Sequence, residues 1–557
     1  MTAYKEKRLP PSPERETRVA INALWGTGRI KCALDQDGIS LSGVLWAYTA
    51  ANSFLPSRIG TLTNSNDVAI SWASCAFRLG REKGKTMIRM RRLILALLCM
   101  AISLAAAESP VYVVLWFDTE DYIEPSSDDA ALRLAKDLTG LGVRATFKVV
   151  GEKARVLQQR GRTDVIRALG QHDIGYHSDN HSIQPTPSVY LRDMGWLDGA
   201  AEFERRESRG VADIQRIFGM TPSCYGQPGS SWGPQSYRAL RRMGIPMYLD
   251  EGTHVGLDAQ PFWFGGLLNV FQMERFLIRP ELNDDSKLPQ TFARFDQVAA
   301  ELRAKGGGVI SSYYHPNEFV TTEFWDGVNF AKGASRERSD WQRPKTRTPE
   351  ESERCYRVLT AYVRHALAVP GVKFVTAREL LQLYAPPVNP NPADRVAAAQ
   401  QLRRGITFLT TKSGTYSPAE LLQTLLGMQP MAVEGPSARV ESTLRSSEIS
   451  KPVFERARLD AVNFIEQNGR LPCEVWIGSQ RLSLADFAAT LAANEGSTAA
   501  AVTMQKGNLE IEKYISNDPV KSFQWAIHPV GFSAPGLLEL ARLQAWTLKP
   551  AVLLHVE

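Results

Sequence analysis

Three of the eight histidines in this 557-residue chain fall within one segment, HDIGYHSDNHS, residues 172–182. His177 and His181 are separated by three residues, a spacing that can bring two imidazoles to one metal ion from a helical turn or from a tight loop. Gly175 and the polar residues after it favour a strand that runs into a loop. Taken alone, such a pair is better explained by two histidines that face solvent, and the other motifs are what favour a metal site.

Carboxylates and another histidine follow two further apolar segments. FDTEDY places Asp118, Glu120 and Asp121 at the end of an apolar run, and YYHP places His315 at the end of another. A charge beside a buried strand is costly unless it is paired or bound to a metal. Two histidines and one carboxylate leave an open metal position for water, while a second carboxylate and a third histidine can act as base and acid. These residue types indicate metal-assisted hydrolysis.

The elements that must position these residues alternate along the chain from residue 111. Strands are predicted over 111–118, 144–151, 173–178, 222–229, 246–252 and 308–316, and helices over about 128–141, 197–218 and 349–369. Interleaved strands and helices predict a parallel sheet, which can close into a (β/α) barrel. In such folds the chemistry gathers at the carboxyl ends of the strands, where the motifs above lie.

The rest of the chain falls outside this alternating pattern. Residues 87–107 combine a basic start, an apolar core and a run of alanines, which predicts a signal peptide and a secreted or periplasmic location. Residues 1–86 are predicted to be an upstream leader without a fold. A proline-rich linker at 386–394 separates the predicted catalytic domain, 108–385, from a small, mainly helical accessory domain, 395–557.

Two segments of the accessory domain, YSPAELLQTL and LSLADFAATL, look like one pattern used twice. Each has a serine followed three residues later by an acid, just before an apolar helix, which is close to a capping box. A true duplication and two ordinary capped helices are equally good explanations.

Composition limits the partners. The net charge of +6 is spread thinly, without a block of basic residues and interleaved aromatics, so no nucleic-acid partner is expected. No membrane span is expected once the signal peptide is removed. Cys224, Cys355 and Cys473 are an odd number at wide spacing, which predicts neither a disulfide framework nor a cysteine-rich zinc site. The sequence does not indicate an oligomeric state.

In this order, FDTED, HSDNH, YGQPGSSWGP and YYHP resemble the motifs of the polysaccharide deacetylase (NodB-homology) family, also called carbohydrate esterase family four. The likeness covers about residues 111–384. It implies a distorted (β/α) barrel, a divalent metal, most often Zn²⁺, and removal of N-acetyl groups from a polysaccharide of amino sugars such as peptidoglycan or a chitin-like glycan.

Carried over by position, the resemblance implies a role for each motif residue. Asp118 is expected to be the general base and His315 the general acid. The family's common form has two adjacent aspartates, whereas Thr119 follows Asp118 here, so the carboxylate ligand is open between two residues. The expected metal ligands are His177, His181 and Glu120, with Asp121 as the alternative to Glu120.

The third motif departs from the family pattern. Family members carry an arginine two residues before the proline, which orients the base, and Gly226 stands at that place. Without the guanidinium, the pKa of Asp118 is expected to rise unless Arg144 or Lys148 substitutes from a neighbouring strand. The expected substrate-binding residues of this motif are Gln227, Pro228, Gly229 and Trp232. The aromatic residues Trp232, Trp263, Phe264 and Trp325 form either a sugar-stacking rim or core packing.

Three functions therefore stay open. The first is a secreted metal-dependent hydrolase that deacetylates an amino-sugar polysaccharide. The second keeps the same site for another non-peptide carbon–nitrogen bond. The third, motivated by the missing arginine and the repeated pattern, is a cell-wall-binding protein with a weakened catalytic site.

Overall fold

The computed structural model describes residues 22–25, 28–31 and 109–554. The chain divides into two compact units, Met1–Ala106 and Ala107–Glu557. In the first unit, the described residues form two antiparallel strands, β1 (Asn22–Trp25) and β2 (Gly28–Lys31). The rest of the predicted leader and the predicted signal peptide at 87–107 lie outside the described residues.

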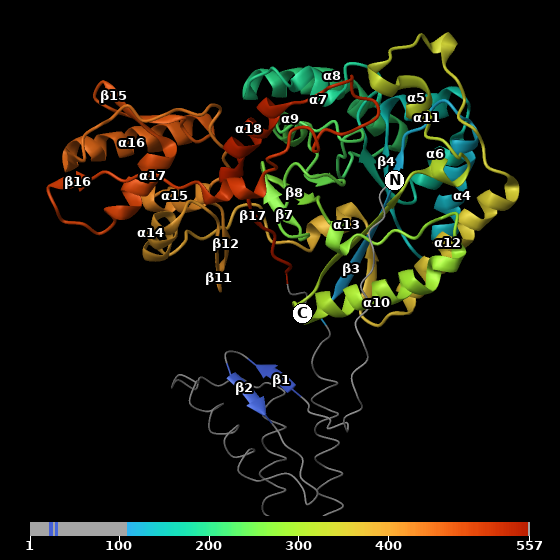
Figure 1. The fold of residues 1–557 in the computed structure, drawn as a ribbon, viewed down its shortest axis with the longest axis horizontal. Helices are drawn as coiled ribbons and strands as arrows, with labels where there is room; N and C mark the ends of the chain where they lie inside the picture. The colour runs from blue at the N-terminus through green and yellow to red at the C-terminus, as the bar shows by residue number, and fades with distance from the viewer. Residues whose placement is uncertain (1–21, 26–27, 32–108, 555–557) are drawn as a thin grey trace, which may run out of the picture. The chain divides into compact units, whose positions relative to one another are not determined.

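A parallel sheet lies at the centre of the second unit (Figure 1). Its main strands are β3 (Val111–Thr119), β4 (Thr146–Val149), β5 (Asp173–Tyr176), β9 (Gly308–Tyr314) and β10 (Val372–Val375). β3 pairs in parallel with β4, β9 and β10 and is buried along its whole length. Its continuous apolar sequence is typical of a strand that is covered on both faces.

Shorter strands extend this sheet around the molecule. Isolated parallel bridges join Tyr176 to Tyr225 and Tyr225 to Tyr248. The next strands are β6 (Met247–Leu249), β7 (Phe262–Phe264) and β8 (Leu267–Val270). β8 pairs in parallel with β6 and antiparallel with β7, and a further parallel bridge joins Leu277 to Ser311 on β9. The result is a distorted (β/α) barrel, which confirms the predicted fold class.

Helices cover the outside of the barrel (Figure 1). They are α4 (Ser126–Gly140), α5 (Gly151–Gln159), α6 (Thr163–Leu169), α7 (Pro187–Leu191), α8 (Trp196–Phe218), α9 (Gln235–Arg242), α10 (Leu288–Ala304), α11 (Trp325–Phe330), α12 (Pro349–Ala368) and α13 (Ala377–Gln382). Short 3-10 turns are η1 (Glu274–Phe276), η2 (Asp285–Lys287), η3 (Pro316–Phe319), η4 (Ala331–Gly333) and η5 (Arg338–Asp340). Over the residues that the structure describes, no helix has both the length and the apolar character needed to cross a membrane.

A second apolar core follows the proline-rich segment and includes Leu421 and Phe487. It is built by α14 (Arg395–Arg404), β11 (Leu409–Thr411), β12 (Gly414–Tyr416), α15 (Pro418–Leu426), β13 (Glu448–Ser450), α16 (Lys451–Asn468), β14 (Glu474–Ile477), β15 (Gln480–Ser483), α17 (Leu484–Ala493) and β16 (Ala501–Thr503). The order helix, antiparallel hairpin, helix occurs twice, in α14 to α15 and in α16 to α17. The same order of elements therefore surrounds both of the similar sequence segments.

The repeated serines cap the second helix of each copy. The Ser417 Oγ accepts a hydrogen bond from the Glu420 N–H at 3.3 Å, and the Ser483 Oγ accepts one from the Asp486 N–H at 3.1 Å. Such a cap satisfies one of the N–H groups that a helix leaves free at its start. Both helix starts therefore agree with the sequence pattern.

The last part of the chain returns to the barrel. It contains η6 (Glu510–Tyr514), α18 (Pro535–Gln544), η7 (Ala545–Thr547) and β17 (Lys549–Pro550). β17 pairs antiparallel with β7, and Leu537 and Ala541 of α18 belong to the barrel core. In Figure 1 the red α18 lies between the orange helices and the green strands β7 and β8. The sequence-based division at residue 395 does not include this return, because helical periodicity does not tell which core a helix joins.

Because β3 pairs with three other strands and is buried along its length, we expect the protein to tolerate little loss of side-chain volume on this strand. Leu115 is fully buried, so Leu115→Ala should lower the free energy of unfolding by about 2–5 kcal/mol in a urea titration. Leu459→Ala is the matched control, since Leu459 on α16 is 51% exposed and should cost less than about 0.5 kcal/mol. Equal effects of the two variants would contradict the central position of β3.

Candidate metal centre and catalytic site

Three side chains predicted as metal ligands converge at the carboxyl ends of β3 and β5, two strands of the same sheet that are separated by β4. Glu120 directly follows β3, while His177 and His181 follow β5. The Glu120 Oε2 lies 3.3 Å from the His177 Nε2 and 2.8 Å from the His181 Nε2. One ligand atom from each of the three residues lies within 4.8 Å of the others, and all three are buried.

The turn that carries His181 is backbone-strained. Ser178 and His181 have φ angles of 65° and 54°, in a region that residues other than glycine rarely adopt. The Ser178 Oγ accepts a hydrogen bond from the His181 N–H at 3.0 Å and so holds the turn. Strain of this kind persists where the surroundings enforce it and is concentrated at functional sites.

The hydrogen bonds of the two imidazoles leave acceptor atoms facing one another. The Gly226 carbonyl lies 3.0 Å from the His177 Nδ1 and can only accept, so Nδ1 carries the proton and Nε2 presents its lone pair to Glu120. The His181 Nδ1 contacts the Ser182 Oγ at 2.6 Å, while its buried Nε2 faces the Glu120 Oε2 at 2.8 Å. A cation placed among these atoms satisfies all three, and a set of two imidazoles and one carboxylate suits Zn²⁺.

The charges of the cluster are coupled. Burial raises the pKa of Glu120, but His181 and His315 outweigh it and hold that pKa well below its ordinary value. Burial lowers the pKa of His181, but the carboxylate of Glu120 raises it overall. Glu120 is therefore ionised, as a metal ligand must be.

Glu120, and not Asp121, lies beside the imidazoles. The Asp121 Oδ1 accepts hydrogen bonds from the Ile123 N–H at 2.9 Å and the Glu124 N–H at 3.0 Å. Burial raises the pKa of Asp121 to about 6, against the lowering effect of Lys153. Asp121 thus shapes the turn between β3 and α4. The Glu120 Oε1, by contrast, accepts a hydrogen bond from the Trp325 Nε1–H at 2.9 Å, which orients this carboxylate.

Lys148, one of the two residues expected to substitute for the absent arginine, lies beside Asp118. Its Nζ lies 2.9 Å from the Asp118 Oδ1 and 2.7 Å from the Asp250 Oδ2, and its side chain is fully buried. A Cβ at Gly226 would overlap both the Lys148 ammonium and the Asp250 carboxylate. The absence of a side chain at position 226 therefore makes room for the lysine. Arg144 does not substitute, since it pairs with Glu379 at the surface.

The lysine keeps Asp118 ionised. Burial raises the pKa of Asp118, but His177, Lys148 and His315 together lower it below its ordinary value. Burial also lowers the pKa of Lys148, which the two carboxylates raise again. Lys148 pairs with the Oδ1 of Asp118. The other carboxylate oxygen, Oδ2, faces His315, whose Nε2 lies 3.7 Å away.

His315 is arranged to carry a proton. Its Nδ1 donates to the Glu318 Oε1 at 2.6 Å, and its side chain is 16% exposed. Burial lowers the pKa of His315, but Glu120 and Glu318 raise it to about 9. His315 is therefore a cation at neutral pH, as a general acid must be.

The Gln227 and Trp232 side chains of the third motif stabilise their own loop and the barrel core, and they do not line an exposed surface. The Gln227 amide donates to the Gly229 carbonyl at 3.1 Å and to the Glu251 carbonyl at 3.0 Å. Trp232 is fully buried and stacks on His254, so the expectation that it binds substrate is wrong. Three other aromatics of the expected rim are at most 5% exposed and also pack in the core, namely Trp263, Phe264 and Trp325.

No protein-family model matches the chain, and no curated protein matches it. Solved structures similar to it include the Xyl-CE4 domain of a multidomain xylanase from the hindgut metagenome of Trinervitermes trinervoides, at 15% identity and a TM-score of 0.27, over 49% of this chain and 90% of that one. A family 4 acetyl xylan esterase from Clostridium thermocellum, in complex with a cobalt ion, is 17% identical at a TM-score of 0.25, over 49% and 91%.

The 4-alpha-glucanotransferase from Thermococcus litoralis is 13% identical at a TM-score of 0.35, over 50% of this chain and 41% of that one. Likenesses of this size, to proteins of different activities, decide neither the family nor the reaction of this chain.

The two carboxylates after β3 give a direct test of the metal centre. Glu120→Gln should weaken Zn²⁺ binding by roughly 100-fold or more, because it removes a charged ligand. Asp121→Asn should bind Zn²⁺ as the wild type does, because Asp121 caps a turn outside the cluster. Calorimetric titration with Zn²⁺ measures both. A larger loss for Asp121→Asn than for Glu120→Gln would overturn the assignment.

Removal of the buried ammonium should change how activity depends on pH. Lys148→Met raises the pKa of Asp118, so activity on the acid side should be lost at higher pH than in the wild type, with kcat lowered roughly 10- to 100-fold. Lys549→Met is the matched control, since Lys549 is also buried and pairs with Glu420, at 2.8 Å, far along the chain. An unshifted acid limb for Lys148→Met would show that Lys148 does not act on the base.

Proposed function

We propose that this chain is a metal-dependent hydrolase that removes N-acetyl groups from an amino-sugar polysaccharide such as peptidoglycan or a chitin-like glycan. One observation carries the proposal. The acceptor atoms of Glu120, His177 and His181 converge at the strand ends that also bring Asp118 and His315 together. The order of the motifs along the chain, which resembles that of the polysaccharide deacetylases, supports the substrate class.

Each residue can be given a step. Glu120, His177 and His181 would hold a divalent ion, which would supply Lewis acidity and lower the pKa of a water molecule. Asp118, whose Oδ1 is held by Lys148, accepts the water proton at its Oδ2. The cationic imidazole of His315 donates a proton to the leaving nitrogen, and Glu318 holds that ring in place through Nδ1.

Lys148 bears on the choice among the three functions. One of the three hypotheses is a catalytic site weakened by the missing arginine. The buried ammonium beside Asp118 supports a catalytically active site instead. Hydrolysis of another carbon–nitrogen bond uses the same residues and differs only in the substrate. Export through the signal at 87–107, action on the cell wall and zinc as the metal are part of the proposal.

Acetate release tests the proposal. With an N-acetylglucosamine oligomer and Zn²⁺, Asp118→Asn should lower the rate of acetate release about 10²- to 10⁴-fold, because the base is lost, and should still bind Zn²⁺. Asp193→Asn, at an 84% exposed side chain, should keep the wild-type rate. No acetate from the wild type, or a wild-type rate for Asp118→Asn, would contradict the proposal.

A further inference from the structure

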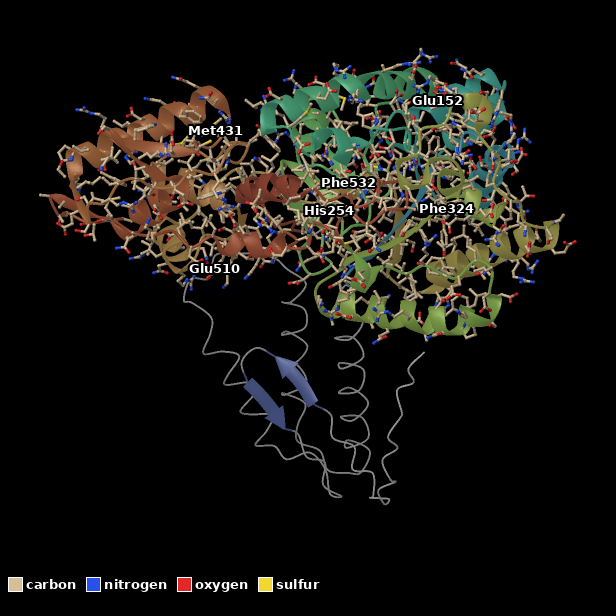
Figure 2. All side chains as sticks on the ribbon, turned by 45° about the horizontal axis from the view of Figure 1, so that its top comes forward. Glu152, His254, Phe324, Met431, Glu510 and Phe532 are labelled. Atoms are coloured by element: carbon tan, nitrogen blue, oxygen red, sulfur yellow. The ribbon has the colours of Figure 1, made fainter. Side chains whose placement is uncertain are left out.

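The segment that leads back to the barrel contacts the candidate site through Trp525. We call residues 516–534, between η6 and α18, the C-terminal strap. It begins at the barrel, because the Ser516 N–H donates to the His254 carbonyl at 3.0 Å. Phe523 of the strap is buried against His254 at 4.8 Å between ring centroids and also contacts Phe532 at 6.0 Å. Figure 2 labels His254 and Phe532 in this region.

Side chains and backbone fix the strap to η4 and to the segment from Gln184 into α7. Ile527 is fully buried in a cluster that includes Trp325, and its carbonyl accepts from the Gln184 amide at 2.9 Å. The Gly333 N–H donates to the same carbonyl at 3.0 Å. The His528 Nε2 lies 2.9 Å from the Ser188 Oγ. The strap is therefore a built part of the site's surroundings.

Trp525 is the strap residue that lies against the candidate metal centre. Its ring is partly exposed and stands edge-to-face on His181, with 5.7 Å between ring centroids and 86° between planes. A Cβ at Gly229 would overlap the indole, so the glycine, with a φ of 51°, allows the ring to approach the third-motif loop. The indole thus lies between a candidate metal ligand and that loop.

A second partly exposed ring lies at the other end of the site. The contacts of the site residues run from His181 through Glu120, His177 and Asp118 to His315. Phe324, labelled in Figure 2, is 41% exposed and packs edge-to-face on His315 at 4.9 Å. Partly exposed aromatic rings therefore contact both His181 and His315, and they come from parts of the chain about 200 residues apart.

We propose that Trp525 is a substrate-binding residue, which stacks on the apolar face of the pyranose ring that carries the acyl group, with Phe324 beside His315 as a second aromatic contact. Indole and phenyl rings present a rigid apolar surface that suits the C–H face of a sugar. This inference rests on the proposed function and adds that the chain's last part supplies a wall of the site. Trp525 thus takes the role of aromatic sugar contact that the sequence had suggested for Trp232.

Two substrates separate sugar binding from chemistry. We compare the N-acetylglucosamine oligomer with 4-nitrophenyl acetate, an acyl substrate without a sugar, on the zinc-loaded full chain. Trp525→Ala should raise KM for the oligomer roughly tenfold, so that the ratio of kcat/KM for the oligomer to that for the ester falls by a similar factor. Trp525→Phe, which keeps a ring, should recover part of the loss.

Trp476→Ala is the matched control, because Trp476 on β14 is 51% exposed and belongs to the second core region. Zinc content and the urea midpoint of each variant report on the fold. A Trp525→Ala variant with the wild-type ratio, or one that loses zinc in proportion to activity, would overturn the role of Trp525 alone. A wild type that cleaves the ester and never the oligomer would overturn the proposed function and this inference together.

Discussion

Three acceptor atoms buried against one another are the constraint on which the site depends. A carboxylate oxygen and two imidazole nitrogens repel one another unless a positive charge lies among them, and the Gly226 carbonyl fixes the proton of His177 on the far nitrogen. Burial makes an unmet charge expensive, so the arrangement is stable only with a cation or with protons in its place. The strained turn at Ser178 and His181 belongs to the same constraint, because it places the second imidazole.

A second buried charge arrangement supports the first. Lys148 lies between Asp118 and Asp250, and the bare backbone of Gly226 makes space for its ammonium. The positive charge beside Asp118 thus comes from an ammonium on β4. Burial raises the pKa of Asp250 to about 7, against the lowering effect of Lys148, whereas the pKa of Asp118 is below its ordinary value. Of the two carboxyl groups that contact Lys148, Asp250 is therefore the one that is protonated first as the pH falls. The base is thereby kept ionised within an enclosed site.

Much of the barrel and its strand-end motifs could be predicted from the sequence, because buried strands and amphipathic helices have distinct periods. β3, β5, β9 and α8 lie within a few residues of their predicted bounds. The same signal, a polar residue at the end of an apolar strand, marks Asp250 after β6, but the sequence does not show which strand ends are neighbours. Trp232 was misassigned because an aromatic residue in a motif has the same sequence signature whether it is buried or exposed. Trp525 could not be found, since it reaches the site only through the return of the chain after a second core.

The most direct measurement is X-ray absorption at the zinc edge on the purified full chain, with the His177→Ala variant beside it. The account predicts about one zinc per chain, bound by two imidazole nitrogens with oxygen donors completing a tetrahedral set, and one imidazole fewer or no zinc in the variant. Zinc without imidazole ligands, or the same spectrum from both proteins, would contradict the account.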